Sequence, residues 1–108
     1  MALISSFPAE ERYALSDQVR RSSRAVKAMI AEAWGRRRYP AAFANKINGA
    51  LGEANETQSW LDDCLDCGYL CPAEFTRMDA AWQSVGAMLR KMTDRAEDFC
   101  RGSQPGTD

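Results

Sequence analysis

The sequence predicts an all-α fold, an antiparallel up-down helical bundle with three long helices. Helix-forming Ala, Leu, Glu, Arg, Met and Gln dominate the 108 residues, of which 45% are hydrophobic and 27% charged. Alternating β-branched runs bounded by turns, the usual sign of strands, do not occur. Apolar residues instead recur at steps of three and four along three stretches of the chain. A chain of this length has room for one modest core, so we expect a single domain over residues 1–102.

The first helix is expected to begin at Phe7-Pro8 and to run to about Trp34-Gly35. Ser6 is its candidate N-cap, and proline is favoured in a first helical turn. Its inward stripe at helical spacing consists of Leu15, Val19, Ser22, Val26, Ile30 and Ala33. The chain then turns, because the proline at position 40 disfavours a helical conformation at Tyr39.

The second helix is expected to run from about Pro40 to Asp66. Gly68 fits a C-cap glycine after it, and Pro72 restarts the chain as a first-turn proline. Its predicted inward stripe is Phe43, Ile47, Ala50, Leu51, Ala54, Leu61 and Leu65. Gly49 and Gly52 lie mid-helix at a cost of about 1 kcal/mol each relative to Ala. This cost suggests that they allow a neighbouring backbone to approach closely.

The third helix has the most regular pattern. Its apolar residues form an unbroken a/d seam, typical of a bundle or coiled coil, at Phe75, Met78, Trp82, Val85, Leu89, Met92, Ala96 and Phe99. Ala81 and Met88 add a second apolar line, which predicts that this helix faces more than one neighbour. Gly102 is expected to end the helix, and residues 103–108 to form a disordered polar tail.

Positive charge gathers in the N-terminal part of the chain. Residues 1–40 hold eight Lys and Arg against four Asp and Glu, residues 41–70 one against five, and residues 71–108 five against six. The candidate nucleic-acid-binding residues, whose charges could meet phosphates, are Arg20, Arg21, Arg24, Lys27, Arg36, Arg37 and Arg38. The alternative is a solvated helix face, or pairing of Arg20 and Arg24 with Glu53 or Glu56. A net charge of −1 counts against a dedicated nucleic-acid binder.

The residue types present argue against an enzyme. The chain has no His, the commonest general base, and it contains no Gly-rich phosphate loop, no G-x-S-x-G and no H-E-x-x-H. Glu53 and Glu56, one helical turn apart, could act as acid and base or bind a cation, but nothing else converges on them. We therefore expect a non-enzymatic protein with no catalytic residue, no cofactor and no small-molecule substrate.

Four cysteines leave a second alternative open. Cys64, Cys67 and Cys71 are closely spaced, Cys100 is distant, and four thiolates could hold zinc. The favoured interpretation makes Cys64 and Cys67 small core residues, with no metal site and no disulfide.

Each of the three tryptophans has its own predicted role. Trp82 lies on the core seam. Trp34 lies beside the basic stripe and Trp60 beside the apolar line of the second helix, so both are predicted to lie in an oligomer interface, where Trp is enriched. The alternative is stacking on nucleic-acid bases.

The chain shows no sign of membrane insertion or export. It contains no apolar run of 18 residues, and its start lacks the basic segment and apolar stretch of a signal peptide. We therefore expect a cytoplasmic protein with no membrane partner.

Five blocks of the sequence resemble, in order, those of one known family. They are FPAEERYAL at residues 7–15, QVRRSS at 18–23, IAEAWGR at 30–36, GALGEANETQ at 49–58 and CGYL at 67–70. They look like the FPxEERYGL, QLRRA, NIAEGxGR, GSLxELETQ and LGYL blocks of the bacterial four-helix-bundle proteins first noticed as products of intervening sequences within 23S ribosomal RNA genes. Lys27, Met29 and Ala33 replace the Pro, Asn and Gly usual in the family, which favours an uninterrupted helix here.

The resemblance carries implications for assembly and partners. Known members form ring-shaped homopentamers, no catalytic activity is established for them, and their fold is similar to the accessory protein of diversity-generating retroelements, which binds reverse transcriptase and nucleic acid. The resemblance therefore implies an oligomeric adaptor, by analogy a homopentamer, with RNA, DNA or a reverse transcriptase as candidate partners.

One departure from the family suggests a different function. The family has a whole amphipathic helix before its FP turn, whereas this chain is expected to begin with the last turn of a truncated first helix. Three helices would then carry apolar stripes suited to four, and a large exposed apolar patch marks an interface. The alternative function is a protein–protein interaction module that accepts a partner helix in an apolar groove and has no nucleic-acid role.

Overall fold

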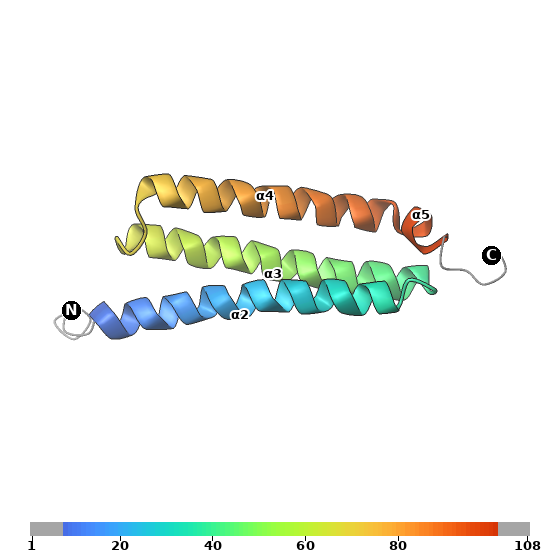
Figure 1. Ribbon diagram of the computed structural model, residues 1–108, viewed down its shortest axis with the longest axis horizontal. Helices are drawn as coiled ribbons and strands as arrows, with labels where there is room; N and C mark the ends of the chain where they lie inside the picture. The colour runs from blue at the N-terminus through green and yellow to red at the C-terminus, as the bar shows by residue number, and fades with distance from the viewer. Residues whose placement is uncertain (1–7, 102–108) are drawn as a thin grey trace.

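The computed structural model describes residues 8–101, which form four helices and no strand. The helices are α2 (Pro8–Gly35), α3 (Pro40–Asp66), α4 (Pro72–Asp94) and the short α5 (Ala96–Arg101). The three long helices run antiparallel, with α3 between α2 and α4 (Figure 1). This confirms the predicted all-α bundle. The expected N-cap Ser6, the preceding helical turn, the stop at Gly102 and the polar tail lie outside the described residues.

The α2 helix is continuous over 28 residues, as the replacements in its C-terminal half favour. It packs along α3, and Ser22, Val26 and Ala33 of its predicted stripe are buried there. Leu15 and Val19 are half-buried. The spacing of three and four residues therefore assigned the inward face of α2 correctly.

The α3 helix holds most of the core because it has a long neighbour on two sides. Its buried residues are Phe43, Ile47, Ala50, Ala54, Thr57, Leu61 and Cys64. The helix ends as predicted, with Gly68 in the left-handed region at φ +78°. The Gly68 amide donates to the Leu65 carbonyl at 3.0 Å and the Tyr69 amide to the Cys64 carbonyl at 2.9 Å, which together form a Schellman motif.

The predicted third helix is divided in two, which corrects the expectation of one helix up to Gly102. The α4 helix ends at Asp94, Arg95 leaves helical geometry at φ −113° and ψ 33°, and α5 follows. The change of direction brings Phe99 onto Phe43 with 6.2 Å between ring centroids, and it buries Cys100 completely. Tertiary packing at this end of α3 therefore overrides the regular heptad pattern.

The α4 helix packs on α3 and makes few contacts with α2. The side-chain amide of Gln58 on α3 donates to the Asp79 carboxylate on α4 at 3.1 Å. Only Gly86 and Leu89 of α4 are buried, and the second apolar line of this helix is exposed. Within residues 8–101 no second long helix packs extensively on α4, and Phe99 of α5 borders that line beside Met88.

The two mid-helix glycines of α3 do not admit a neighbouring backbone, which corrects the prediction. A Cβ atom at Gly49 would lie 3.3 Å from Sδ of Met29, a side-chain atom of α2. A Cβ atom at Gly52 would have no atom of a neighbouring helix within 4 Å.

Among the described residues, no helix combines the length and the apolar character needed to cross a bilayer.

Candidate nucleic-acid interface

An exposed basic stripe runs along α2 on the side that faces away from α3. Arg20, Arg24 and Lys27 are at positions i, i+4 and i+7, so their side chains share one helix face. All three residues are exposed, whereas the buried Ser22 and Val26 face α3. We call these three residues the basic stripe. A helix face opposite the core is open to a large partner such as a nucleic-acid backbone.

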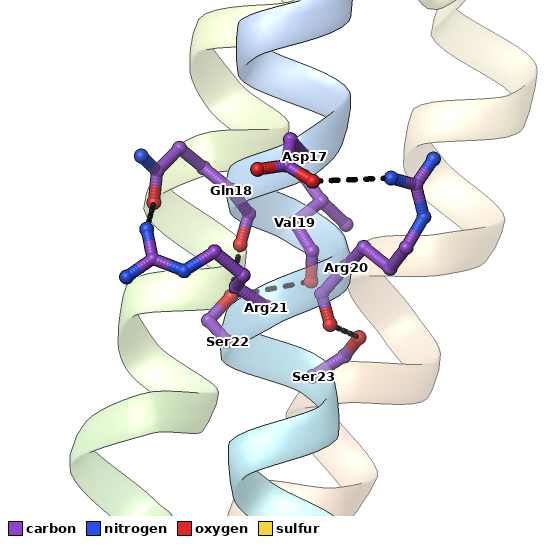
Figure 2. Close-up of polar contacts among 7 residues, drawn as sticks. All are labelled: Asp17, Gln18, Val19, Arg20, Arg21, Ser22 and Ser23. Atoms are coloured by element: carbon purple, nitrogen blue, oxygen red, sulfur yellow. Dashed lines mark hydrogen bonds and ion pairs between the residues drawn. The ribbon is translucent and has the colours of Figure 1, made fainter.

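Arg20 and Arg21 point to opposite sides of α2 (Figure 2). Nη1 of Arg20 lies 3.2 Å from Oδ1 of Asp17 in an exposed i,i+3 ion pair. Nη1 of Arg21 donates to Oε1 of Gln18 at 3.3 Å. Arg21 lies on the side of α3 and lines a shallow hollow together with Glu53 and other residues of both helices. It is therefore not part of the basic stripe.

The interhelical ion pairs considered from the sequence are not formed. Within the described part of the chain, no ion pair joins Arg20 or Arg24 to Glu53 or Glu56, and Arg20 pairs with Asp17 on its own helix. An exposed pair of this kind contributes about 0.3–0.5 kcal/mol and is screened by salt. A phosphate can therefore displace Asp17 from Arg20 at little cost.

The turn between α2 and α3 carries the second part of the predicted basic surface. Arg36 and Arg38 are exposed, and Arg37 is half-buried because it folds back over Trp34. Its guanidinium carbon lies 4.2 Å from the centre of the Trp34 ring, and its Nη1 donates to the Trp34 carbonyl at 3.0 Å. Tyr39, which is exposed and is not among the residues predicted from the sequence, follows the three arginines. Its position as the aromatic residue between this run and Pro40 is the signal that could have identified it.

A lysine of α3 neutralises the acidic residue nearest to this turn on α2. Nζ of Lys46 lies 2.7 Å from Oε1 of Glu32. The hydrogen bond and charge of Lys46, together with the charge of Arg36, lower the pKa of the Glu32 carboxyl despite partial desolvation. Glu32 is therefore ionised at neutral pH and has its closest cation in Lys46.

The four cysteines differ in burial. Cys64 and Cys100 are buried, as expected of small core residues, whereas Cys67 and Cys71 are exposed, which corrects the core assignment of Cys67. The Cys71 side chain caps α4 in a capping box with Glu74. All four are free thiols, and residues 8–101 contain no group of three or more cysteine or acidic residues placed to hold a metal ion.

The environment of the Cys64 and Cys67 thiols, near the end of α3, raises the pKa of both groups. Desolvation and the neighbouring Cys67 and Asp63 raise the pKa of Cys64. Desolvation and the carboxylates of Glu11, Asp63 and Asp66 raise the pKa of Cys67. Because the thiolate is the reactive form, this environment opposes nucleophilic chemistry at neutral pH.

Tyr69 joins the α3–α4 turn to the first turns of α2. Its hydroxyl donates to Oε1 of Glu11 at 2.5 Å, and the guanidinium carbon of Arg12 lies 5.6 Å from the centre of its ring. The hydrogen bond to Glu11, then desolvation and the negative charge of Glu11, raise the pKa of Tyr69 to about 12. The hydroxyl is therefore a permanent donor under ordinary conditions.

The two tryptophans predicted to lie in an interface differ in exposure. Trp34 is 49% exposed. Trp60 is half-buried within the chain, and its Nε1 is buried without a hydrogen-bond partner in the described structure. Trp82 on α4 is half-buried and packs against the core. Trp34 is therefore the more exposed of the two.

The fold and this surface define a class of protein, an all-α helical bundle with an exposed basic face on an outer helix. The chain belongs to the 23S rRNA-intervening sequence protein family, whose family model matches residues 1–91. The match confirms the resemblance found in the sequence blocks, and this family is not among the known enzyme families. No curated protein and no solved structure matched the chain.

Proposed function

We propose that this protein is a non-enzymatic, oligomeric helical adaptor that binds the RNA backbone through the basic stripe of α2. One observation carries the proposal: Arg20, Arg24 and Lys27 are exposed together on the helix face opposite the core. The family description, which names an element of ribosomal RNA genes, supports RNA as the partner rather than a small molecule.

The mechanism is electrostatic. Arginine and lysine side chains bind phosphate oxygens and release counterions, which gives affinity that falls steeply with salt and does not depend on base sequence. Arg36, Arg37 and Arg38 extend the same charge to the end of α2. The net charge of −1 does not oppose this, because the excess of negative charge lies in residues 41–70, which hold one basic residue against five acidic ones, whereas residues 1–40 carry an excess of positive charge.

Assembly would multiply this surface. We propose a homo-oligomer, a pentamer by analogy with the family, in which each subunit adds one basic stripe. Several stripes on one particle raise the apparent affinity through effective concentration without any new kind of contact. The exposed apolar residues of α4 are the surface where copies of the chain would meet.

The proposal is tested by titrating labelled single-stranded RNA at several salt concentrations. Each lost phosphate contact lowers the slope of log affinity against log salt by about 0.7 for a single strand, so Arg20→Ala/Arg24→Ala/Lys27→Ala should lower it by about two. The control, Arg12→Ala/Arg77→Ala/Arg90→Ala, removes the same number of exposed positive charges at positions outside the basic stripe and should change the slope much less.

Further outcomes decide whether the protein binds RNA at all and which partner it prefers. Absence of binding at low salt, or equal effects of the two triple variants, would contradict the proposal. Competition by unlabelled DNA shows how far the stripe distinguishes the two nucleic acids. Binding of a reverse transcriptase that persists after nuclease treatment would assign the adaptor to a protein partner instead.

A second candidate function is supported by the apolar surface of α4. Met88 is 60% exposed and Phe99 37% exposed, and with Lys91 and Met92 they line an almost wholly apolar hollow of about 240 Å³. In this alternative the hollow takes an amphipathic helix of another protein and the arginines serve only solubility. A purified chain that is monomeric, binds no RNA and binds a designed amphipathic helix at this surface would favour it.

A further inference from the structure

The turn between α2 and α3 displays two aromatic rings beside three arginines. Trp34 is 49% exposed and Tyr39 is 62% exposed, and Arg36, Arg37 and Arg38 lie between them in the chain. Aromatic rings beside arginines are typical of surfaces that bind single-stranded nucleic acid. We infer that this turn is a nucleobase-stacking site that takes unpaired nucleotides of single-stranded RNA, an inference that rests on the proposed function.

The backbone of the turn is well fixed. The Arg36 amide donates to the Ala33 carbonyl and the Tyr39 amide to the Arg36 carbonyl, both at 2.9 Å. Pro40 then starts α3, and Tyr39 takes the extended conformation usual before proline, at φ −121° and ψ 97°. Because the chain is already ordered, little conformational entropy is lost when a ligand binds.

Arg37 prepares the Trp34 ring for stacking. Its guanidinium carbon lies 4.2 Å from the ring centre, and its Nη1 donates to the Trp34 carbonyl at 3.0 Å. The guanidinium therefore covers part of the indole while nearly half of the side chain stays exposed. A nucleobase that stacks on the exposed part of the Trp34 ring would extend the stack that Arg37 and Trp34 already form. Cation–π attraction between the guanidinium and the aromatic rings stabilises such a stack.

The charge around the rings favours phosphate. Arg36 and Arg38 are exposed, and the first turn of α3 contains no acidic residue. Glu32, the acidic residue of α2 nearest to the turn, is already paired with Lys46 at 2.7 Å. The arginines of the turn can therefore bind the phosphates on either side of a stacked base.

The basic stripe leads directly to Trp34. Trp34 follows Arg20, Arg24 and Lys27 on the same helix face, because it is 14 residues beyond Arg20 and α-helical positions seven apart nearly coincide. The distance along the axis is about 21 Å at about 1.5 Å per residue, which matches about six stacked nucleotides at roughly 3.4 Å each. One strand can thus contact the stripe with its phosphates and the turn with a terminal base.

The proposed site distinguishes single-stranded RNA from duplex RNA and does not distinguish one base sequence from another. A duplex hides the faces of its bases, whereas a single strand offers them, and every base has a face that can stack. The basic stripe alone would bind both forms through phosphates. Any preference for single strands must therefore come from Trp34 and Tyr39.

The test compares a labelled single-stranded RNA of about twelve nucleotides, longer than the ~21 Å estimated above, with the duplex of the same sequence. We expect Trp34→Ala to weaken single-strand binding about 5- to 150-fold, the range that corresponds to one stacked base, and to leave duplex binding unchanged. Trp34→Phe should restore most of the loss, and Tyr39→Ala should weaken single-strand binding in the same selective way.

The control is Gln83→Ala, because Gln83 is exposed but lies on α4, away from both the basic stripe and the turn between α2 and α3. It should change neither affinity. Circular dichroism and sedimentation of each variant check the fold and the oligomeric state. Loss of assembly in Trp34→Ala would assign the ring to a subunit interface, as first predicted from the sequence, and would overturn the inference.

The inference and the proposed function can fail separately. Equal binding of single strand and duplex, with no effect of Trp34→Ala, overturns the stacking site and leaves the backbone-binding adaptor intact. No binding of either RNA at low salt overturns both. A selective loss of single-strand binding in Trp34→Ala, alongside a loss of both forms in the stripe variant, supports both.

Discussion

Ser22 and Thr57 form a buried pair of hydroxyl groups between α2 and α3. Thr57 is fully buried, and its Oγ1 donates to Oγ of Ser22 at 2.7 Å, while Ser22 donates to the Gln18 carbonyl at 2.9 Å. The helical spacing placed Ser22 on the inward face but did not predict the burial of Thr57. The sequence of one helix does not show whether the facing helix holds a hydrogen-bond partner for such a polar residue. Only the register of the two helices supplies that partner.

The hydroxyl pair should show strong coupling in a double-mutant cycle. Thr57→Val and Ser22→Ala should each cost about 1 kcal/mol in the free energy of unfolding, because each leaves the other hydroxyl with one bond fewer. The double variant should cost clearly less than the sum of the two, since no unpaired hydroxyl remains. Urea unfolding of the four proteins measures this, and strictly additive effects would show that the hydrogen bond contributes nothing.

Tyr69 should make stability depend on alkaline pH. Its pKa is raised from 10.0 to about 12 in the folded protein, so the folded state holds the proton more tightly than the unfolded state. The stabilisation is therefore fully present below pH 10.0 and is lost as the pH rises towards about 12. The free-energy difference between wild type and Tyr69→Phe should shrink over this range in denaturant titrations.

The variant Glu11→Gln tests whether the Glu11 carboxylate causes the alkaline loss of stability assigned to Tyr69. It keeps a hydrogen-bond acceptor near Tyr69 but removes the charge that contributes to the raised pKa. The alkaline loss of stability should begin at lower pH in this variant than in the wild type. The same pH profile in wild type, Tyr69→Phe and Glu11→Gln would show that the contact is not formed in solution.

At the scale of elements, the sequence located the long helices well and their internal detail less well. The Pro8, Pro40 and Pro72 starts and the Gly68 stop are local signals, since they depend on backbone geometry within a few residues. The end of α4 at Asp94 has no such signal. The position of this end depends on the packing of Phe99 against Phe43, which lies on another helix.

The mid-helix glycines of α3 should respond differently to substitution by alanine. Gly52→Ala should raise the free energy of unfolding by about 0.5–1 kcal/mol, because its Cβ enters open space and alanine favours the helix. Gly49→Ala should gain less, because its Cβ would lie 3.3 Å from Sδ of Met29. Thermal or urea unfolding measures both. Equal gains in the free energy of unfolding would show that the Met29 side chain moves away without cost. In a Met29→Ala background we expect the two substitutions to give equal gains.

At the scale of the whole molecule, α3 has neighbours on two sides while α2 and α4 barely meet. This arrangement leaves α4 with only two buried residues and an apolar line open to solvent. Exposed Met88 and Phe99 lie at one end of this surface. Contact of apolar side chains with water is unfavourable, and this is the physical basis of the proposal that copies of the chain meet at this surface.

Self-association should depend on the α4 surface. We expect the wild type to sediment above the mass of one chain, and Met88→Glu to shift it towards the monomer, because a charge cannot be buried in an apolar contact at low cost. Gln83→Glu adds the same charge at another exposed position of α4 and should leave the assembly unchanged. A monomeric wild type, or equal dissociation by both variants, would contradict an oligomer built on this surface.

Local signals along the chain were enough to predict the helical class, the bounds of α2 and α3, the start of α4, the Gly68 stop and the exposure of Arg20, Arg24 and Lys27. Each of these follows from local geometry or from helical periodicity, which act within one element. Contacts between elements set the break at Arg95, the burial of Thr57, the exposure of Cys67 beside buried Cys64, the divergence of Arg21 from Arg20, and the stacking of Arg37 on Trp34. These features depend on which side chains meet across helices and turns, and such contacts exist only once the register and direction of the packed elements are set.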